Sequence, residues 1–356
     1  MQSIEERFQA VGGRPAGFDY MRLVLSSLVI VWHSFSVTGV GYGVVFGYLG
    51  IFGELLFPMI LGMFFALSGF LVAGSLERCK TLISFMGLRL IRIYPALAVE
   101  VLLSAFLIGP LLTSVSLQEY FTSPTFFSYM WNVLGHIHYQ LPGLFLDNPK
   151  ANIVNSQLWT VPWELACYVS LAVLVLIRAR KWPIIFVLVM LGGAVFISTF
   201  DSVPRGTRLV ITFLGGISVY YYRSKIPWHF GFFLLALAIA FTAAWFRQQG
   251  LLLICIPYMT VYLGLCNPVR LSIVQGADYS YGMYLYGYVI QQALYQTLPL
   301  AHLWYMNAIL SILVAAAFAA FSWHSIEKPA LRLRPYVKKT EEFFLRRSSR
   351  SAQLPS

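Results

Sequence analysis

Two ionisable side chains stand eleven residues apart in the first long apolar stretch, which reads FDYMRLVLSSLVIVWHSFSV. Eleven residues turn an α-helix by about three full turns and rise by roughly 16 Å, so Arg22 and His33 share one face at different depths. A neutral histidine can act as a general base near neutral pH. The spacing alone leaves two interpretations open, a functional histidine and a structural one bonded to a neighbouring helix.

A pair of arginines follows, in the segment RLIRIYP after a short basic stretch at 77–92. Arg89 and Arg92 are three residues apart and therefore share a helix face. Each guanidinium offers a planar fork of donors that suits phosphate. The alternative is that both simply anchor the cytoplasmic end of a span. Pro95 is expected to mark the place where this helix begins or kinks.

Carboxylates also occur in or beside apolar segments. Glu164 follows Trp159 in NSQLWTVPWELACY, at the outer part of a predicted span. The tryptophans can be explained as an interface belt, whereas the glutamate cannot, so Glu164 is a candidate site residue. Glu100 is predicted to lie inside another span, where an ionisable group needs a partner or water. Glu327 and Lys328 are expected to pair at the inner rim.

Small and aromatic residues add two further motifs. Ser68 in FFALSGF either donates a hydrogen bond into a site or, with Gly69, forms a notch for helix packing. The segment DYSYGMYLYGY, which contains Tyr281, is rich in tyrosine. Such a stripe is more typical of packing or of a membrane interface than of a platform for a sugar.

The elements that must position these side chains are predicted to be membrane-spanning helices. Hydrophobic residues make up 58% of the 356 residues and charged residues only 11%, whereas a soluble domain carries about a quarter charged residues. We therefore predict an all-α, polytopic transmembrane helical bundle of about 10 spans, each of roughly 20 residues. The predicted spans are 23–40, 55–76, 93–112, 158–177, 183–200, 208–222, 229–246, 250–266, 279–298 and 303–324.

The basic residues give this bundle a direction. With the N-terminus in the cytoplasm and the spans alternating, only Lys150, Arg205, Arg208 and Arg247 lie outside, and the other 21 of the 25 Lys and Arg lie inside. This separation follows the positive-inside rule. The net charge of +11 is thus mostly a topology signal and does not indicate a nucleic-acid partner. Both termini are predicted to be cytoplasmic.

The remaining features of the sequence indicate how the chain is divided into domains. We expect one membrane domain over 1–335 and a basic cytoplasmic tail at 336–356 that is disordered. The N-terminal residues are polar and lack the apolar run of a cleavable signal peptide. The four cysteines form no CxxC pair and no metal-ligand spacing, so neither disulfides nor a metal are expected. The long outer segment 113–157 is a candidate for function, as long loops often are.

Taken in order, the motifs resemble those of the acyltransferase-3 family of integral membrane O-acyltransferases. The resemblance covers about residues 15–335, and it rests on the order of six motifs, each of them weak alone. One departure is Gly287, which stands where many members have a histidine, and the following Ile290-Gln291-Gln292 resembles the branch acting on exopolysaccharides or nodulation-type oligosaccharides. The six motifs are Arg22 with His33, FFALSGF with Ser68, Arg89-Leu-Ile-Arg92 followed by Tyr94, Leu158-Trp159-Thr160-Val161 with Glu164, SYGMYLYG with Tyr281, and IEKP.

The resemblance implies an enzyme that moves an acyl group, most often acetyl, from cytoplasmic acetyl-CoA to a saccharide hydroxyl at the outer side. The acceptor would be an exopolysaccharide, an O-antigen or a lipo-oligosaccharide, free or lipid-linked, and the membrane would be the bacterial cytoplasmic membrane. His33 would be the catalytic base or acyl carrier, and Glu164 would orient the sugar or polarise His33. The remaining assignments are Arg22, Ser68, Arg89, Arg92 and Tyr94 for the acyl-CoA, and Trp159 and Tyr281 for the acceptor.

Two other classes of protein fit the same composition. A transporter or flippase of a sugar-containing substrate would also have many spans and a few buried ionisable residues, but the sequence shows no internal repeat of the kind common in transporters. A sensor or scaffold with a degenerate site is the third possibility, and the presence of both Arg22 and His33 argues against it.

Overall fold

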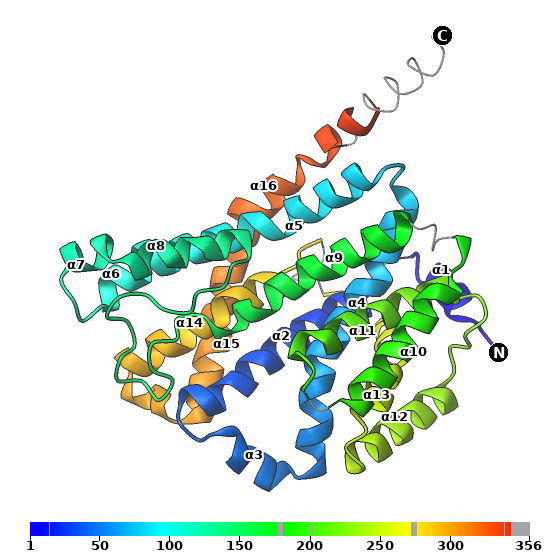
Figure 1. The fold of residues 1–356 in the computed structure, drawn as a ribbon, viewed down its shortest axis with the longest axis horizontal. Helices are drawn as coiled ribbons and strands as arrows, with labels where there is room; N and C mark the ends of the chain where they lie inside the picture. The colour runs from blue at the N-terminus through cyan, green and yellow to red at the C-terminus, as the bar shows by residue number, and fades with distance from the viewer. Residues whose placement is uncertain (14, 177–180, 201, 272–275, 338, 343–356) are drawn as a thin grey trace.

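The apolar runs form helices because a helix satisfies its own backbone hydrogen bonds, which lipid cannot do. The computed structural model describes residues 1–13, 15–176, 181–200, 202–271, 276–337 and 339–342. Within these ranges the regular structure is helical, and one isolated bridge between Ser3 and Pro227 is the only β-type pairing. Figure 1 shows the helices gathered into one bundle.

Each of the ten predicted apolar segments coincides with a helix. The ten helices are α2 (Ala16–Val37), α4 (Ile51–Arg78), α5 (Leu82–Leu103), α9 (Val161–Leu176), α10 (Ile184–Thr199), α11 (Arg205–Tyr221), α12 (Phe230–Trp245), α13 (Gln249–Gly264), α14 (Ser280–Thr297) and α15 (Trp304–Ser322).

By length and composition, five stretches of the described chain are suited to cross a membrane: α2, α4, α5 with its continuation to Leu112, the stretch from Ser156 through α9, and the one that begins with α15. Several other apolar helices, such as α10, are 16 residues long, a rise of about 24 Å against a hydrocarbon core of about 30 Å. The described part of the chain is therefore all-helical, the protein is a multi-pass membrane protein, and the count of ten spans stays a prediction.

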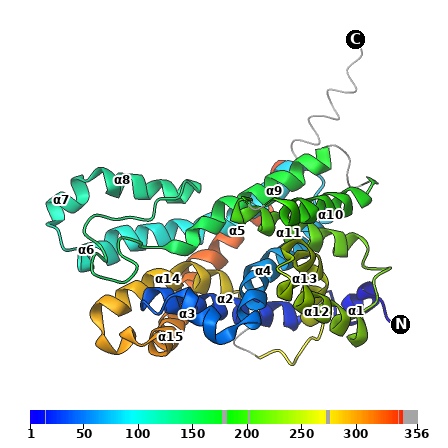
Figure 2. The same cartoon turned by 60° about the horizontal axis from the view of Figure 1, so that its bottom comes forward.

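Short helices connect and extend the long ones. The segment with α6 (Gly109–Leu112), α7 (Leu117–Thr122) and α8 (Pro124–Met130) projects at the end of the molecule opposite α1 (Ile4–Ala10) (Figures 1 and 2). The other short helices are α3 (Tyr42–Leu49), α16 (Lys328–Leu331), the π-helical turns η1 (Ser104–Ile108) and η7 (Trp323–Glu327), and the 3₁₀ turns η2 (Trp131–Leu134), η3 (Ser156–Thr160) and η6 (Pro299–His302).

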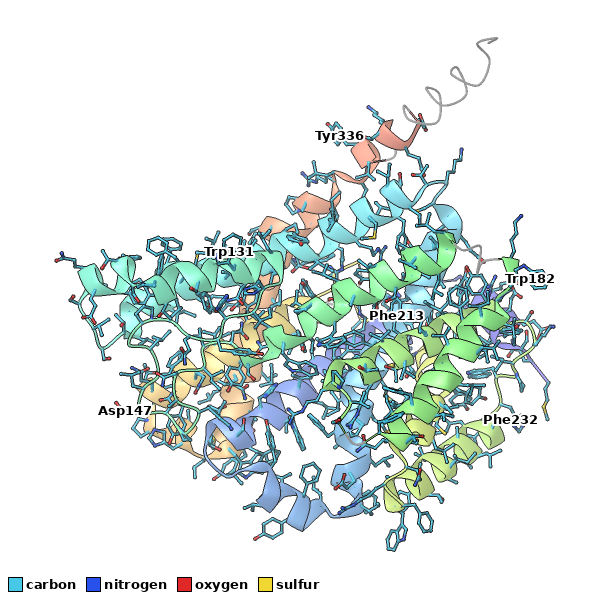
Figure 3. The ribbon with its side chains drawn as sticks, viewed as in Figure 1. Trp131, Asp147, Trp182, Phe213, Phe232 and Tyr336 are labelled. Carbon is cyan, nitrogen blue, oxygen red and sulfur yellow. The ribbon has the colours of Figure 1, made fainter. Side chains whose placement is uncertain are left out.

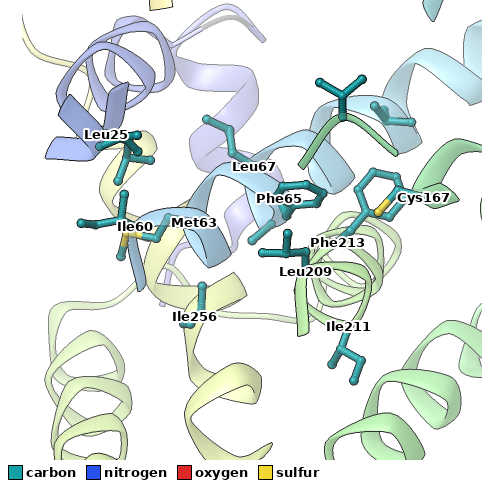
Figure 4. Close-up of a cluster of buried hydrophobic side chains, with 14 of the residues drawn as sticks. Leu25, Ile60, Met63, Phe65, Leu67, Cys167, Leu209, Ile211, Phe213 and Ile256 are labelled. Carbon is teal, nitrogen blue, oxygen red and sulfur yellow. The ribbon is translucent and has the colours of Figure 1, made fainter. Parts of the chain in front are cut away.

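The core forms where α4 and α11 cross with their backbones in contact. A Cβ atom on Gly69 would lie 2.0 Å from the carbonyl oxygen of Phe213, and one on Gly216 would lie 1.9 Å from that of Ala66. Small residues let membrane helices approach this closely. Buried side chains from both helices, among them Phe65 and Phe213, fill the space beside the crossing (Figure 4). The packing interpretation of the FFALSGF motif is thus confirmed for Gly69.

Helix α5 begins earlier than predicted. The third span was expected from residue 93, but the helix starts at Leu82, where the hydroxyl of Thr81 accepts a hydrogen bond from the Ser84 backbone N–H at 3.2 Å. Pro95 therefore lies inside the helix and does not begin it. As a consequence Arg89 and Arg92 stand on a regular helix that packs against the bundle, and not on a loop.

The end of the outer segment runs down the side of α14. The amide of Gln292 donates to the carbonyl oxygens of Lys150 and Ile153, both at 2.7 Å. Eight residues earlier on α14, the carbonyl oxygen of Tyr284 accepts from the Gln157 amide at 2.9 Å. Those eight residues correspond to about 12 Å along the helix axis. The outer segment thus descends into the bundle, and α9 begins well below the end of α14.

The predicted tail is described only in part. Residues 336–337 and 339–342 are helical, and the buried carboxylate of Glu341 accepts hydrogen bonds from the Thr81 backbone N–H at 2.6 Å and its hydroxyl at 3.0 Å. Residues 343–356 lie outside the described residues, as do Arg14, Arg178, Arg180 and Lys338 among the positions used to predict topology.

Segments with opposite predicted orientation lie at opposite ends of the molecule. Figure 3 labels Trp131 and Asp147 at one end, in the segment predicted to be outside. It labels Trp182 at the opposite side and Tyr336 at the top, both in segments predicted to be inside.

Candidate active site

Helices α2 and α14 run side by side in the same direction. Their contacts show at which depth of the bundle Arg22 and His33 lie. Near the start of both helices, Arg22 Nη1 lies 2.7 Å from Asp278 Oδ2. Farther along, the rings of His33 and Tyr288 meet edge to face with centroids 5.1 Å apart. Arg22 and His33 therefore lie at two depths of one helix, as their spacing predicted.

A large cavity of about 1030 Å³ opens at the depth of His33. Its wall includes His33 from α2, Trp159 from η3 and Tyr288 from α14. Three basic residues, Lys150, Arg205 and Arg208, line it as well. The cavity therefore combines a histidine, aromatic rings and positive charge, which are groups that can deprotonate a hydroxyl, stack on a sugar and bind an anion.

A second, smaller cavity of about 90 Å³ lies at the depth of Arg22. Four of the predicted site residues line it: Arg22, Ser68, Glu164 and Tyr281. Leu61 and Tyr284 line both cavities and form the boundary between them. The Tyr284 hydroxyl is tied to Thr160 Oγ1 at 2.7 Å. These two side chains therefore stand between the two cavities.

The structure does not bring Glu164 to His33. Glu164 accepts a hydrogen bond from the Tyr168 hydroxyl at 2.7 Å, one turn farther along α9. Nδ1 of His33 is buried without a hydrogen-bond partner among the described residues. Glu164 was expected at the outer part of its span, yet it shares a cavity with Arg22, because the descending outer segment lowers the start of α9.

Arg22 and Arg92 belong to an ion network that the sequence did not reveal. Arg92 Nη2 lies 2.5 Å from Asp278 Oδ2, the oxygen that also binds Arg22, and Arg92 Nη1 lies 3.1 Å from Glu327 Oε2. Burial opposes ionisation of Asp278, but the two guanidiniums hold the pKa of this carboxyl well below its usual range. The predicted pairing of Glu327 with Lys328 is wrong, since Glu327 turns into the bundle toward Arg92.

Arg89 has a different environment. Its Nη2 donates to the Ser75 hydroxyl at 3.1 Å, and its Nε is buried without a partner in the described chain. No described carboxylate forms an ion pair with it. The two arginines of the motif therefore differ: Arg92 is neutralised by carboxylates, whereas Arg89 retains donor capacity. Tyr94 lines neither cavity and packs against the core.

Sequence reasoning missed the residues that hold the site together. Asp278 stands in the DYSYGMYLYGY segment, and its position just before a span, at the depth of Arg22, was the signal that could have found it. Asn155 and Gln157 carried no such signal, because both bind backbone carbonyls of α14 that only the fold brings near. Asn155 also binds the buried Glu100, which supplies the partner expected for that carboxylate. Among the described residues no cluster of three metal-ligating side chains occurs.

The sequence is similar to one known protein family and to two characterised proteins. Residues 16–325 match the sequence pattern of a family described as an acyltransferase domain. The chain is 27% identical over 339 residues to an O-acetyl transferase of Shigella phage Sf6, covering 87% of this chain and 94% of that protein. It is 27% identical over 361 residues to nodulation protein 10 of Rhizobium leguminosarum bv. viciae, covering 90% and 95% respectively. No solved structure matches the chain significantly.

Proposed function

Because the chain belongs to the acyltransferase-3 family, whose pattern covers residues 16–325, we propose that it moves an acetyl group from cytoplasmic acetyl-CoA to a hydroxyl of a saccharide at the outer side. Membership confirms the resemblance predicted from the motifs and makes the chain an acyltransferase. The name of the phage relative supports acetyl as the group and oxygen as its acceptor. We place the enzyme in the bacterial cytoplasmic membrane, with both termini in the cytoplasm.

The observation that carries this proposal is the pair of cavities that meet at Leu61 and Tyr284. His33 lines the large one and Arg22 the small one. A transferase that takes its donor from one side and its acceptor from the other needs two compartments with a narrow connection. A short acyl group fits such a connection, whereas the polyanionic head of CoA does not enter the apolar interior readily.

At the reacting atoms we assign the proton transfer to His33. As a general base, its imidazole takes the proton of the acceptor hydroxyl while that oxygen attacks the thioester carbonyl. The C–S bond then breaks, and the CoA thiolate leaves and takes up a proton. As a nucleophile, the imidazole would first displace CoA and carry the acyl group to the hydroxyl. Both routes use the imidazole of His33 at the wall of the large cavity, and both give the same products, free CoA and the acylated hydroxyl.

On the donor side we assign phosphate binding to Arg89. Its guanidinium keeps an unpartnered Nε, and charge-assisted bonds to phosphate are the strongest that such a group makes. Arg22 and Arg92 already share Asp278, so they act as positioning residues in this proposal. Ser68, Glu164 and Tyr281 line the small cavity and would contact the donor arm. This moves Glu164 and Tyr281 from the acceptor side, where the sequence had suggested them, to the donor side.

The test is acyl transfer by purified protein. Protein in detergent is incubated with acetyl-CoA labelled in the acetyl group, with and without a saccharide acceptor, and release of free CoA and labelling of the saccharide are measured. His33→Ala should abolish transfer, because it removes the proton acceptor. His136→Ala is the matched control, since that histidine is exposed in the outer segment and lines neither cavity.

The outcomes separate the candidate functions. Acceptor-dependent release of CoA that is lost in His33→Ala and kept in His136→Ala supports the transferase. Full activity of His33→Ala would remove this histidine from the mechanism. Movement of a sugar-containing substrate across vesicles without any acyl donor, and no release of CoA, would instead indicate a transporter or flippase.

A further inference from the structure

We infer that the acceptor carries a negative charge, a carboxylate or a phosphate, and that Lys150, Arg205 and Arg208 bind it at the wall of the large cavity. This inference rests on the proposed function and names the substrate class that the acceptor cavity selects. Its evidence is the charge and the placement of these three side chains, and a buried donor of Arg208 that has no partner among the described residues.

The three cations come from two elements that meet at one cavity. Arg205 and Arg208 lie three residues apart in the first turn of α11 and so share a face, and Lys150 belongs to the descending outer segment. The part of the cavity wall that the structure describes contains no Asp and no Glu. None of the three forms an ion pair with a described residue, whereas Arg22, Arg92, Arg223 and Arg270 all do.

Arg208 has an unsatisfied donor at this wall. Its Nε is buried and finds no hydrogen-bond partner among the described residues. A buried donor without a partner costs free energy, more so when the group is charged. A bound anion would satisfy this donor and neutralise the charge at once, as guanidinium–carboxylate and guanidinium–phosphate pairs do.

The start of α11 adds to the positive potential. This helix of 17 residues begins at Arg205, and no side chain caps its first N–H groups. Its first turn contains no acidic residue that would offset the helix dipole. The free N–H groups and the positive end of the dipole favour an anion at the same place as the two arginines.

The predicted topology favours a binding role for these three charges. Basic residues are depleted outside a membrane protein, and only four are predicted outside here. Three of the four line the large cavity, and Arg247 alone lies elsewhere. Anchoring at the cytoplasmic surface, the usual reason for basic residues at span ends, does not apply to this side.

The aromatic wall of the cavity suits a glycan. Trp32 stacks on Tyr42, with ring centroids 4.8 Å apart, and on Phe57, with centroids 4.4 Å apart. Trp159 lines the same cavity, and we assign it the stacking on a sugar ring. The anion can belong to an acidic sugar of the glycan or to a pyrophosphate that links the glycan to a lipid, and the two sources have the same chemistry at the arginines.

The test compares three acceptors with the same sugar sequence. They are an oligosaccharide that contains glucuronic acid, its carboxyl-reduced neutral form, and the neutral form attached to a polyprenyl pyrophosphate. Purified full-length protein is assayed for acetyl transfer, and binding of each fluorescently labelled acceptor is measured separately without donor. Arg205→Gln, Arg208→Gln and Lys150→Gln are compared with Arg247→Gln, a matched control that removes an outer charge away from the cavity.

Loss of one charge-assisted contact is expected to weaken binding of the anionic acceptor by on the order of tenfold to a hundredfold. Transfer should fall through KM for the acceptor, with KM for acetyl-CoA unchanged, and Arg247→Gln should behave like the native protein. Preference for the glucuronic acid form assigns the anion to the glycan, and preference for the pyrophosphate form assigns it to the lipid link.

If neutral and charged acceptors bind equally well and the three substitutions do not change their binding, the inference is overturned. The proposed acetyl transfer is still supported in that case if CoA is released. Conversely, selective binding of the anionic acceptor with no CoA release in any assay would uphold the anion site and refute acetyl transfer. The binding measurement therefore decides the inference whether or not transfer is observed.

Discussion

At the scale of single residues, Arg89 and Arg92 show that one motif can contain two roles. Both were predicted to bind phosphate, since they share a helix face. Only the fold showed that Asp278 and Glu327, which are distant in sequence, form ion pairs with Arg92. Glu327 is 2% exposed, so removing its partner would leave a charge buried in the bundle.

Separate substitutions should therefore have different effects. Arg92→Gln is expected to lower the free energy of unfolding by about 3 kcal/mol, the cost of leaving a buried carboxylate unpaired, measured by thermal unfolding in detergent. Arg89→Gln should change the free energy of unfolding much less, since it removes a hydrogen bond to Ser75 and no ion pair, and it should raise KM for acetyl-CoA. Combining Arg92→Gln with Glu327→Gln should recover part of the lost stability. If Arg92→Gln melts like the native protein and only raises the donor KM, the structural role of Arg92 is refuted.

At the scale of elements, the crossing of α4 and α11 sets how closely the two helices pack beside the small cavity. Ser68 stands next to Gly69 on α4, and the side chains of Ser68 and Phe213 both line that cavity. Because the backbones touch at Gly69 and Gly216, any added side chain must push the helices apart and displace Ser68 with them.

Alanine at either glycine should consequently destabilise the protein. Gly69→Ala and Gly216→Ala each introduce a methyl group that meets a backbone carbonyl, and a cost of at least about 1–3 kcal/mol is expected from overpacking. Gly192→Ala on α10 is the matched control, because nothing lies within 4 Å of the new Cβ, and helix propensity favours the change. Thermal unfolding of the three variants checks this, and an unchanged midpoint for Gly69→Ala would contradict the close crossing.

At the scale of the whole molecule, the proposal depends on the orientation of the bundle. The donor is assigned to the side of Arg89 and the acceptor to the side of Lys150, Arg205 and Arg208. A reversed protein would present the basic cavity to the cytoplasm, and it would then be a second candidate for the anionic head of CoA. Orientation is therefore the property of the molecule that most affects the mechanism.

Cysteine labelling in intact cells tests the orientation. Gln118 and Lys225 are both exposed and are predicted outside and inside. In a background with Cys79 and Cys266 replaced by serine, Gln118→Cys should react with a membrane-impermeant maleimide. Lys225→Cys should react only after the cells are opened. The reverse pattern would invert the topology and with it the assignment of the two cavities.

The sequence by itself determined the class of the protein and the position of its helices. Apolar runs specify helices in lipid whatever surrounds them, because backbone hydrogen bonds must be satisfied locally. All ten predicted segments accordingly coincide with helices. The spacing of Arg22 and His33 likewise predicted two depths on one face, since both residues belong to one continuous helix.

Only the tertiary structure decided which residues share a cavity. Glu164 stands with Arg22 and apart from His33 because amides such as Gln157 and Gln292 bind the outer segment along α14 and lower the start of α9. Arg92 meets Asp278 for a similar reason, since the two are 186 residues apart in sequence. Contacts of this kind depend on how helices are packed against each other, and periodicity along a single helix contains no information about its neighbours.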